Sequence, residues 1–233
     1  MLQKVSILLI LILFSRICAA QHHSAIPNGY KLLWADEFEE GNKPNPEFWS
    51  YENGFVRNEE LQWYQSENAI IQNGNLRILG KKESVKNDRF NPESNNWKES
   101  REFAEYTSAS INTRGKFDFQ FGILEVKAKI DTSMGMWPAI WTLGIEKGWP
   151  SNGEIDVMEY YLVDQKPAIL ANAAWKGATS YVSWDSEKIP FSKFLKKDPK
   201  WAEKFHVWKM EWTTDFIKIY LDDELLNTIS LSE

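Results

Sequence analysis

Cysteine and histidine are scarce in this sequence of 233 residues. The one cysteine, Cys18, excludes a framework of intrachain disulfides. His206 is the only histidine after residue 23. A single histidine excludes a histidine-based metal cluster and argues against a Ser-His-Asp triad. We therefore expect the His206 side chain to be packed. Glycine-rich phosphate loops, dinucleotide fingerprints and internal repeats are also missing. Any chemistry in this chain must therefore use other groups.

Basic runs and long apolar runs are missing as well. The formal net charge is −6, and because residues 1–20 carry Lys4 and Arg16 but no acid, the rest of the chain carries −8. A net acidic chain without basic runs argues against nucleic acid and anionic membranes as partners. The apolar run Val5–Phe14 is too short to span a bilayer comfortably.

That apolar run belongs to a pattern typical of a secretory signal peptide over residues 1–20. Lys4 supplies the positive start, and Cys18–Ala20 is a small-residue cleavage site. Cleavage there leaves no thiol, and export without disulfides indicates a bacterial protein that is secreted, periplasmic or held at the cell envelope. A lipid anchor on Cys18 is the alternative, although the residues before it fit such a site poorly. Residues 21–29 form a polar leader that we expect to be mobile.

Short β-prone stretches separated by turns dominate the remaining chain, and a hydrophobic content of 43% suffices for one core. Residues 30–233 therefore predict one all-β domain, an antiparallel β-sandwich. Asn73-Gly74 marks a hairpin, and the charged segment 81–105 predicts a long loop. The only expected helix is 201–205, after an N-cap at Asp198 and a proline. We expect strands at 31–38, 48–52, 69–71, 75–79, 109–112, 117–119, 122–130, 168–174, 206–212, 216–221 and 225–229.

The stretch Gly153–Tyr160 places three carboxylates within six residues. In a strand, Glu154 and Asp156 share one face, and a one-residue bulge at Val157–Met158 would return Glu159 to it. Like charges this close cannot all ionise, so one carboxyl should hold a proton near neutral pH. A carboxylate beside a protonated carboxylic acid is the equipment for hydrolysing a glycosidic bond. The alternative is a solvated acidic strand face, which usually carries Lys, Thr or Ser as well.

The segments around these acids resemble glycoside hydrolase family 16. Trp149–Glu159 carries the pattern Glu-x-Asp-x-x-Glu, Gly135–Trp141 matches Gly-x-Trp-Pro-Ala-x-Trp, and Phe205–Trp212 matches Phe-His-x-x-x-x-Glu-Trp. Further matches in the expected order extend the resemblance from about Tyr30 to the last residue: Asp36-Glu37-Phe38, Asn58-Glu59 and Gly74-Asn75-Leu76.

This resemblance implies a β-jelly roll with a concave sugar-binding sheet, and a monomeric, laminarinase-like retaining endo-hydrolase that needs no cofactor. Its substrate would be β-1,3-glucan (laminarin) or mixed-linkage β-1,3-1,4-glucan. Glu154 would be the nucleophile, Glu159 the general acid/base, and Asp156 would hold the proton balance between them. Alternatives are a non-catalytic β-glucan-binding sandwich, a transglycosylase, and a hydrolase of agarose, carrageenan or xyloglucan.

Aromatic and polar side chains offer candidate substrate contacts. Twelve tryptophans are many for this length, and those outside the core could stack on sugars, because a flat ring matches the apolar face of a pyranose. The alternatives are a core position for the tryptophans, a surface turn around Asn58 and an ordinary surface role for Arg101. The candidate substrate-binding residues are Asn58, Arg101, Trp137, Trp141 and Trp149.

Three departures from the family pattern carry expectations of their own. Many relatives have a histidine near the position of Ala174, which here removes a polar contact to the acid/base residue. Relatives often bind a structural calcium through backbone oxygens near the equivalents of Glu37 and Gly74 plus an aspartate beyond Glu233, so we expect a weakened calcium site. Relatives add about one or two strands beyond the position of Glu233, so we expect this chain to lack C-terminal strands and to be unstable or poorly active.

Overall fold

The structure is a computed structural model that describes residues 26–179 and 181–231 and divides into two units, Met1–Ala35 and Asp36–Glu233. In the first unit, residues 26–35 contain a turn in which Tyr30 N donates to Pro27 O at 3.1 Å, and no helix or strand. The strand predicted over 31–38 is wrong. Leu32 and Leu33 are 64% and 67% exposed, so these residues bury no apolar strand face. The predicted signal peptide and residues 21–25 of the leader lie outside the described residues.

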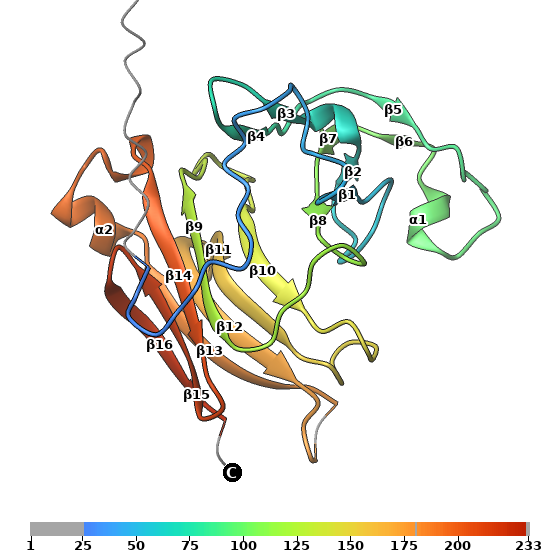
Figure 1. The fold of residues 1–233 in the computed structure, drawn as a ribbon. Helices are drawn as coiled ribbons and strands as arrows, with labels where there is room; N and C mark the ends of the chain where they lie inside the picture. Colours follow the sequence, from blue (N-terminus) through green and yellow to red (C-terminus); the bar gives the residue numbers. More distant parts are fainter. Residues whose placement is uncertain (1–25, 180, 232–233) are drawn as a thin grey trace, which may run out of the picture. The chain divides into compact units, whose positions relative to one another are not determined.

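Two four-stranded antiparallel sheets form the body of the second unit. Figure 1 shows the yellow to orange sheet beside the one that combines green β9 with red strands. In spatial order, the first sheet contains β10 (Ala139–Leu143), β11 (Glu154–Val163), β12 (Lys166–Trp175) and β13 (Ser183–Pro190). The second contains β16 (Glu224–Ser230), β15 (Phe216–Leu221), β14 (His206–Trp212) and β9 (Gly122–Ala128).

The core lies between these two sheets, because alternation gives each strand one apolar face. Ile155 and Ile169 from the first sheet share it with Trp208 and Ile219 from the second. Burial of large apolar side chains contributes about 1.5–3 kcal/mol each to stability. The predicted antiparallel β-sandwich is confirmed.

Short two-stranded sheets lie in residues 36–112. The predicted hairpin at Asn73-Gly74 is confirmed, with both residues at positive φ, 55° and 67°. Phe55, Trp63 and Ala104 form a second, smaller core. The pairs are β1 (Ser50–Tyr51) with β8 (Ile111–Asn112), β2 (Gln62–Tyr64) with β7 (Tyr106–Ser108), β3 (Ala69–Ile71) with β4 (Leu76–Ile78), and β5 (Val85–Lys86) with β6 (Phe103–Ala104).

The segment 81–105 is more ordered than predicted. It contains β5, β6 and α1 (Trp97–Ser100), which one buried amide helps to organise. Asn87 is 1% exposed, and its Nδ2 donates to Lys98 O at 2.8 Å and to Arg101 O at 2.9 Å. Hydrogen bonds that help to order this segment therefore come from one buried side chain, which the periodicity of apolar residues in the sequence does not predict.

The helix predicted over 201–205 is also wrong. Trp201–Glu203 is a single 3-10 turn (η2), and a second 3-10 turn, η1, covers Ser66–Asn68. The longer helix, α2 (Ser192–Lys197), comes earlier, and Asp198 caps its C-terminal end. Asp198 Oδ1 accepts from Lys200 N at 3.0 Å, so this aspartate turns the chain between the two elements instead of starting a long helix.

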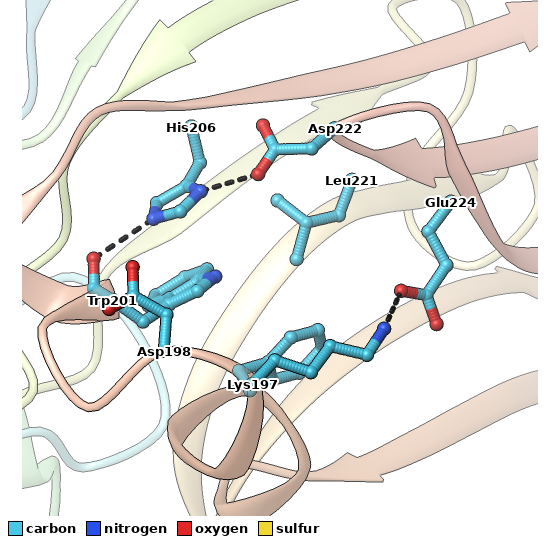
Figure 2. A pocket seen from close by; sticks show the side chains of 8 residues that line it. Lys197, Asp198, Trp201, His206, Leu221, Asp222 and Glu224 are labelled. Carbon is cyan, nitrogen blue, oxygen red and sulfur yellow. Dashed lines mark hydrogen bonds and ion pairs between the residues drawn. The ribbon is translucent and has the colours of Figure 1, made fainter.

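His206 is packed, as predicted. Its Nδ1 lies 2.5 Å from Asp222 Oδ2, its Nε2 lies 2.9 Å from Trp201 O, and its ring stacks on Trp201 with centroids 3.8 Å apart. Figure 2 shows these contacts in a pocket that α2 and the β14–β16 strands line. Both imidazole nitrogens are engaged, so this pocket offers no free histidine. Within the described ranges, no helix is long and apolar enough to cross a membrane.

Candidate active site

The bulge predicted in the acidic motif is present in β11. Opposite β12, Asp156 pairs with Asn172 and Glu159 pairs with Leu170, so Val157 and Met158 together oppose one residue. Both bulged side chains enter the core, with exposures of 0% and 1%. Two consecutive apolar residues are thus buried, and Glu159 returns to the face of Glu154 and Asp156.

The strand register extends this face across the first sheet. Cross-strand partners share a face, so each acid belongs to a row of four side chains, one from each strand. We call these rows together the acid face. From β10 to β13 they are Ala139, Glu159, Leu170 and Lys188; then Trp141, Asp156, Asn172 and Ser186; then Leu143, Glu154, Ala174 and Trp184.

The turn between β10 and β11 fixes where Glu154 begins the strand. Gly144 N donates to Gly153 O at 3.2 Å, and Gly153 has a φ of +77°, which favours glycine. A Cβ on Gly144 would lie 2.1 Å from Asn152 O, so this close approach also requires glycine. The Gly-Glu-Ile-Asp sequence therefore combines the end of a tight turn with the first two acids.

Glu159 accepts two hydrogen bonds, one on each carboxylate oxygen. Trp137 Nε1 donates to its Oε1 at 2.9 Å, and Asn172 Nδ2 donates to its Oε2 at 3.0 Å. Burial raises the pKa of Glu159, the Trp137 hydrogen bond lowers it, the nearby Glu154 raises it and the Asn172 hydrogen bond lowers it, with a net upward shift. A carboxyl group with a raised pKa suits proton donation and return.

Asp156 sits between the two glutamates and is 2% exposed. Burial first, and then the negative charges of Glu159 and Glu154, raise the pKa of Asp156 to about 8. Asp156 therefore holds a proton at neutral pH and can share it with Glu154, to which it is hydrogen-bonded. The expectation that one of the three carboxyls stays protonated agrees with this environment.

Trp137 and Trp141 both lie beside the acids. Trp137 precedes β10, is 48% exposed and packs against Tyr161 with ring centroids 5.2 Å apart. Trp141 pairs with Asp156, and the Arg57 guanidinium lies 5.2 Å from its ring centroid. One Trp141 ring face is thus covered by the protein, whereas Trp137 keeps half of its surface open.

Asn58 lies in a loop whose Arg57 contacts Trp141, and Arg101 follows α1 in another part of the chain. Arg101 donates to Glu60 O at 2.6 Å and to Glu59 O at 2.9 Å. Its guanidinium also lies 5.2 Å from the Phe55 and Trp97 ring centroids. Arg101 therefore holds the loop that carries Asn58, which is an indirect role for a residue we predicted to bind substrate.

The Glu154 end of the acid face carries further aromatic side chains. Trp149, 44% exposed, meets the Tyr181 ring edge-on at 6.0 Å. Trp184, on β13, is 49% exposed and pairs with Ala174, which in turn pairs with Glu154. The small Ala174, which is 1% exposed, lies between Glu154 and Trp184 in this row. Only the strand pairing reveals this position of Trp184, because the sequence around it is polar and lacks a clear strand pattern.

A metal centre finds little support in the described residues. Residues 26–179 and 181–231 contain no group of three or more His, Cys, Asp or Glu side chains that could hold an ion. A calcium site built from backbone oxygens near Glu37 and Gly74 stays a prediction. The acid face itself provides paired carboxyl groups and donors, which suffice for acid–base and nucleophilic chemistry.

Comparison with known proteins agrees with this geometry. The profile of glycosyl hydrolases family 16 matches residues 57–233. A beta-glucanase from Rhodothermus marinus is 30% identical over 239 residues, which cover 97% of this chain and 74% of that protein. The laminarinase catalytic domain from Thermotoga maritima is 32% identical at a TM-score of 0.68, over 86% of this chain and 77% of that one.

A second solved structure, from work on endo-acting O-glycanases of the human gut microbiota that initiate mucin breakdown, is 32% identical at a TM-score of 0.77. The alignment with this second structure covers 88% of this chain and 73% of the other chain. The jelly-roll sandwich and the acid face define a glycoside hydrolase. The chain belongs to glycosyl hydrolases family 16, and the predicted family and fold are confirmed.

Proposed function

We propose that this chain is a retaining endo-hydrolase of β-1,3-glucan or mixed-linkage β-1,3-1,4-glucan. The observation that carries the proposal is the acid face, where the bulge brings Glu154, Asp156 and Glu159 into line. Relatives named as a beta-glucanase and a laminarinase support the substrate. Retention requires two carboxyl groups about 5–5.5 Å apart, and Glu154 and Glu159 lie on one strand face on either side of Asp156.

In the first step, Glu159 donates its proton to the glycosidic oxygen as the bond from that oxygen to the anomeric carbon breaks. Glu154 attacks the same carbon as a carboxylate and forms a covalent glycosyl ester. The proton that Asp156 holds disperses the negative charge of Glu154 before attack and stabilises that carboxylate as a leaving group afterwards. The hydrogen bonds from Trp137 and Asn172 fix the orientation of the Glu159 carboxyl group.

In the second step, Glu159 is ionised and accepts a proton from water. The water oxygen bonds to the anomeric carbon, and the ester bond to Glu154 breaks. Both carboxyl groups return to their starting states, and the product keeps the β configuration. In a transglycosylase a sugar hydroxyl would replace the water.

Exposed aromatic rings give the polysaccharide a surface on both sides of the acids. Trp137 lies beside Glu159, whereas Trp149 and Trp184 lie toward the Glu154 end. Because cleavage by an endo-hydrolase needs sugars bound on both sides of the scissile bond, this distribution supports internal cleavage. The pattern of residues 1–20 supports a substrate outside the cytoplasm, and we propose a secreted or envelope monomer.

Mucin-type O-glycan is a second candidate substrate. Its support is the structure with the TM-score of 0.77, above the 0.68 of the laminarinase domain at equal identity. Both candidates use the same acids and differ in the sugar that the aromatic surface accepts. A panel of polysaccharide substrates must therefore distinguish the two candidates.

The test measures reducing-end release from laminarin, lichenan, agarose, xyloglucan and mucin O-glycans. We expect oligosaccharides from laminarin or lichenan, and β-anomers as the first products in proton NMR spectra. α-Anomers would overturn retention, and preferred cleavage of mucin O-glycans would establish the second candidate. Binding without cleavage would identify a β-glucan-binding sandwich.

Substitution of the two glutamates tests their roles. We expect Glu154→Gln and Glu159→Gln each to lower hydrolysis by at least about 10²- to 10⁴-fold, because each removes a group that reacts with substrate. Circular dichroism should show an unchanged fold. Hydrolysis of laminarin within a few-fold of the unmodified protein by either variant would contradict the assignment.

A further inference from the structure

We infer that Asn172 is a positioning residue for the reaction, and that its side-chain amide holds Glu159 and Asp156 in fixed relation to each other. This inference rests on the proposed function. Asn172 lies on β12 directly opposite Asp156 and is 3% exposed. Its Nδ2 lies 3.0 Å from Glu159 Oε2 and 3.4 Å from Asp156 Oδ2. One amide nitrogen thus faces both carboxyl groups.

Ser186 fixes the direction of this amide. It pairs with Asn172 across β12 and β13, and its Oγ donates to Asn172 Oδ1 at 2.5 Å. A reversed amide would turn Oδ1 toward two carboxyl groups that need donors. The hydroxyl and the acids therefore favour the same orientation, with nitrogen toward the acids and oxygen toward Ser186.

No neighbour on β12 can substitute for Asn172. Leu170 and Ala174 are its nearest neighbours on the acid face, and neither side chain has a hydrogen-bond donor. An asparagine has two N–H groups on one nitrogen, so it can serve two acceptors at once. An aspartate at this position would instead add a fourth acid to the cluster.

The consequence for the reaction concerns the protonation of Glu159. Glu159 must hold a proton in the first step and lose it before the second. Burial raises the pKa of Glu159, and the hydrogen bond from Asn172 opposes this by stabilising the carboxylate. Loss of Asn172 should therefore raise the pKa of Glu159 further and leave its carboxyl held by the Trp137 hydrogen bond alone.

The experiment compares Asn172→Ala with the unmodified full chain on the best substrate of the panel. We expect kcat to fall about tenfold to a hundredfold, because hydrogen bonds to charged groups have effects of this size. KM should change by less than about threefold, and the alkaline limb of the pH profile should move upward. Ser186→Ala should shift the profile in the same direction by a smaller amount. Glu187→Ala, next to Ser186 but on the other strand face, is the matched control and should behave like the unmodified chain.

Carboxyl carbon NMR titration of Glu159 without substrate provides a readout that does not need activity. We expect a higher Glu159 pKa in Asn172→Ala, and also in Ser186→Ala if the first variant fails to fold. An unchanged titration together with an unchanged pH profile would overturn the inference. A chain that cleaves no carbohydrate would instead refute the proposed function, and the titration would still decide the role of Asn172.

Discussion

Asp156 is a carboxyl group that the fold keeps almost completely out of water. Its pKa of about 8 in the folded protein lies far above the value of about 3.9 expected in an unfolded chain. The folded state therefore binds this proton more tightly than the unfolded state does. The stability that Asp156 contributes is fully present below about pH 4 and is lost as the pH rises toward about 8.

We predict that Asp156→Asn is more stable than the unmodified protein and that the difference grows between about pH 4 and 8. Asparagine cannot ionise, so it avoids a cost that reaches a few kcal/mol at alkaline pH. Hydrolysis should nevertheless fall, because the shared proton next to Glu154 changes. Urea unfolding at pH 5 and pH 8 checks this prediction. Equal differences in unfolding free energy at both pH values would contradict it.

The sequence revealed the acids but not the residues that hold them. Glu154, Asp156 and Glu159 stand together in the chain, and strand parity alone predicted their common face and the bulge. Asn172 and Ser186 are contributed by other strands, and their role depends on cross-strand register, which one sequence does not determine. We expected that the absence of a histidine near Ala174 removes a polar contact to Glu159. Asn172, in the neighbouring row, supplies a polar contact to Glu159.

Strand prediction succeeded where alternation was strong and failed where pairing decided the outcome. β11, β12 and β14 have clear apolar faces and were predicted. β13 (Ser183–Pro190) was not, because its sequence is largely polar and it becomes a strand by pairing with β12 along its whole length. Propensity for β-structure depends on such packing more than on the residue itself.

Strand β13 supports a prediction about binding through Trp184. The indole lies two strands from Glu154, at about 10 Å by the usual strand spacing, with only Ala174 between them. We expect Trp184→Ala to raise KM about fivefold with a smaller change in kcat, because it removes an aromatic stacking contact of about 0.5–1.5 kcal/mol.

Trp175→Ala is the matched control for this prediction. Trp175 is 41% exposed, ends β12 and is adjacent to Ala174, so strand alternation directs it to the opposite face. Its removal should leave KM unchanged. Equal KM effects of both substitutions, measured on the same oligosaccharide, would show that Trp184 does not contact substrate.

At the scale of the whole molecule, the amino-acid composition and the spacing of turn residues were sufficient to predict the β-sandwich. Short β-prone segments separated by turn residues can bury their apolar faces only by stacking two sheets. The connections were harder to predict. The position of α2 and the order within 81–105 depend on buried groups such as Phe194 and Asn87, which pack or hydrogen-bond with residues distant in the sequence.

Asn227 links the two large sheets through a buried polar contact. It lies on β16 and is 6% exposed, and its Nδ2 donates to Ala171 O of β12 at 2.9 Å and to Asp185 Oδ1 of β13 at 3.0 Å. The sheets are otherwise joined mainly by apolar packing, so this amide favours one alignment of the layers. Its loss would remove the donor from the buried Ala171 O and from the partly buried Asp185 carboxylate.

We predict that Asn227→Ala lowers the free energy of unfolding by about 1–3 kcal/mol, the usual cost of an unsatisfied buried polar group. For a chain of this length, each kcal/mol corresponds to about 2–4 °C in melting temperature. Thr228→Ala, the exposed neighbour on β16, is the matched control and should change the melting temperature little. Residual hydrolysis at low temperature should match that of the unmodified protein, because Asn227 lies on the opposite side of the first sheet from the acids. A melting temperature for Asn227→Ala within about 1 °C of the Thr228→Ala value would show that apolar packing alone aligns the two sheets.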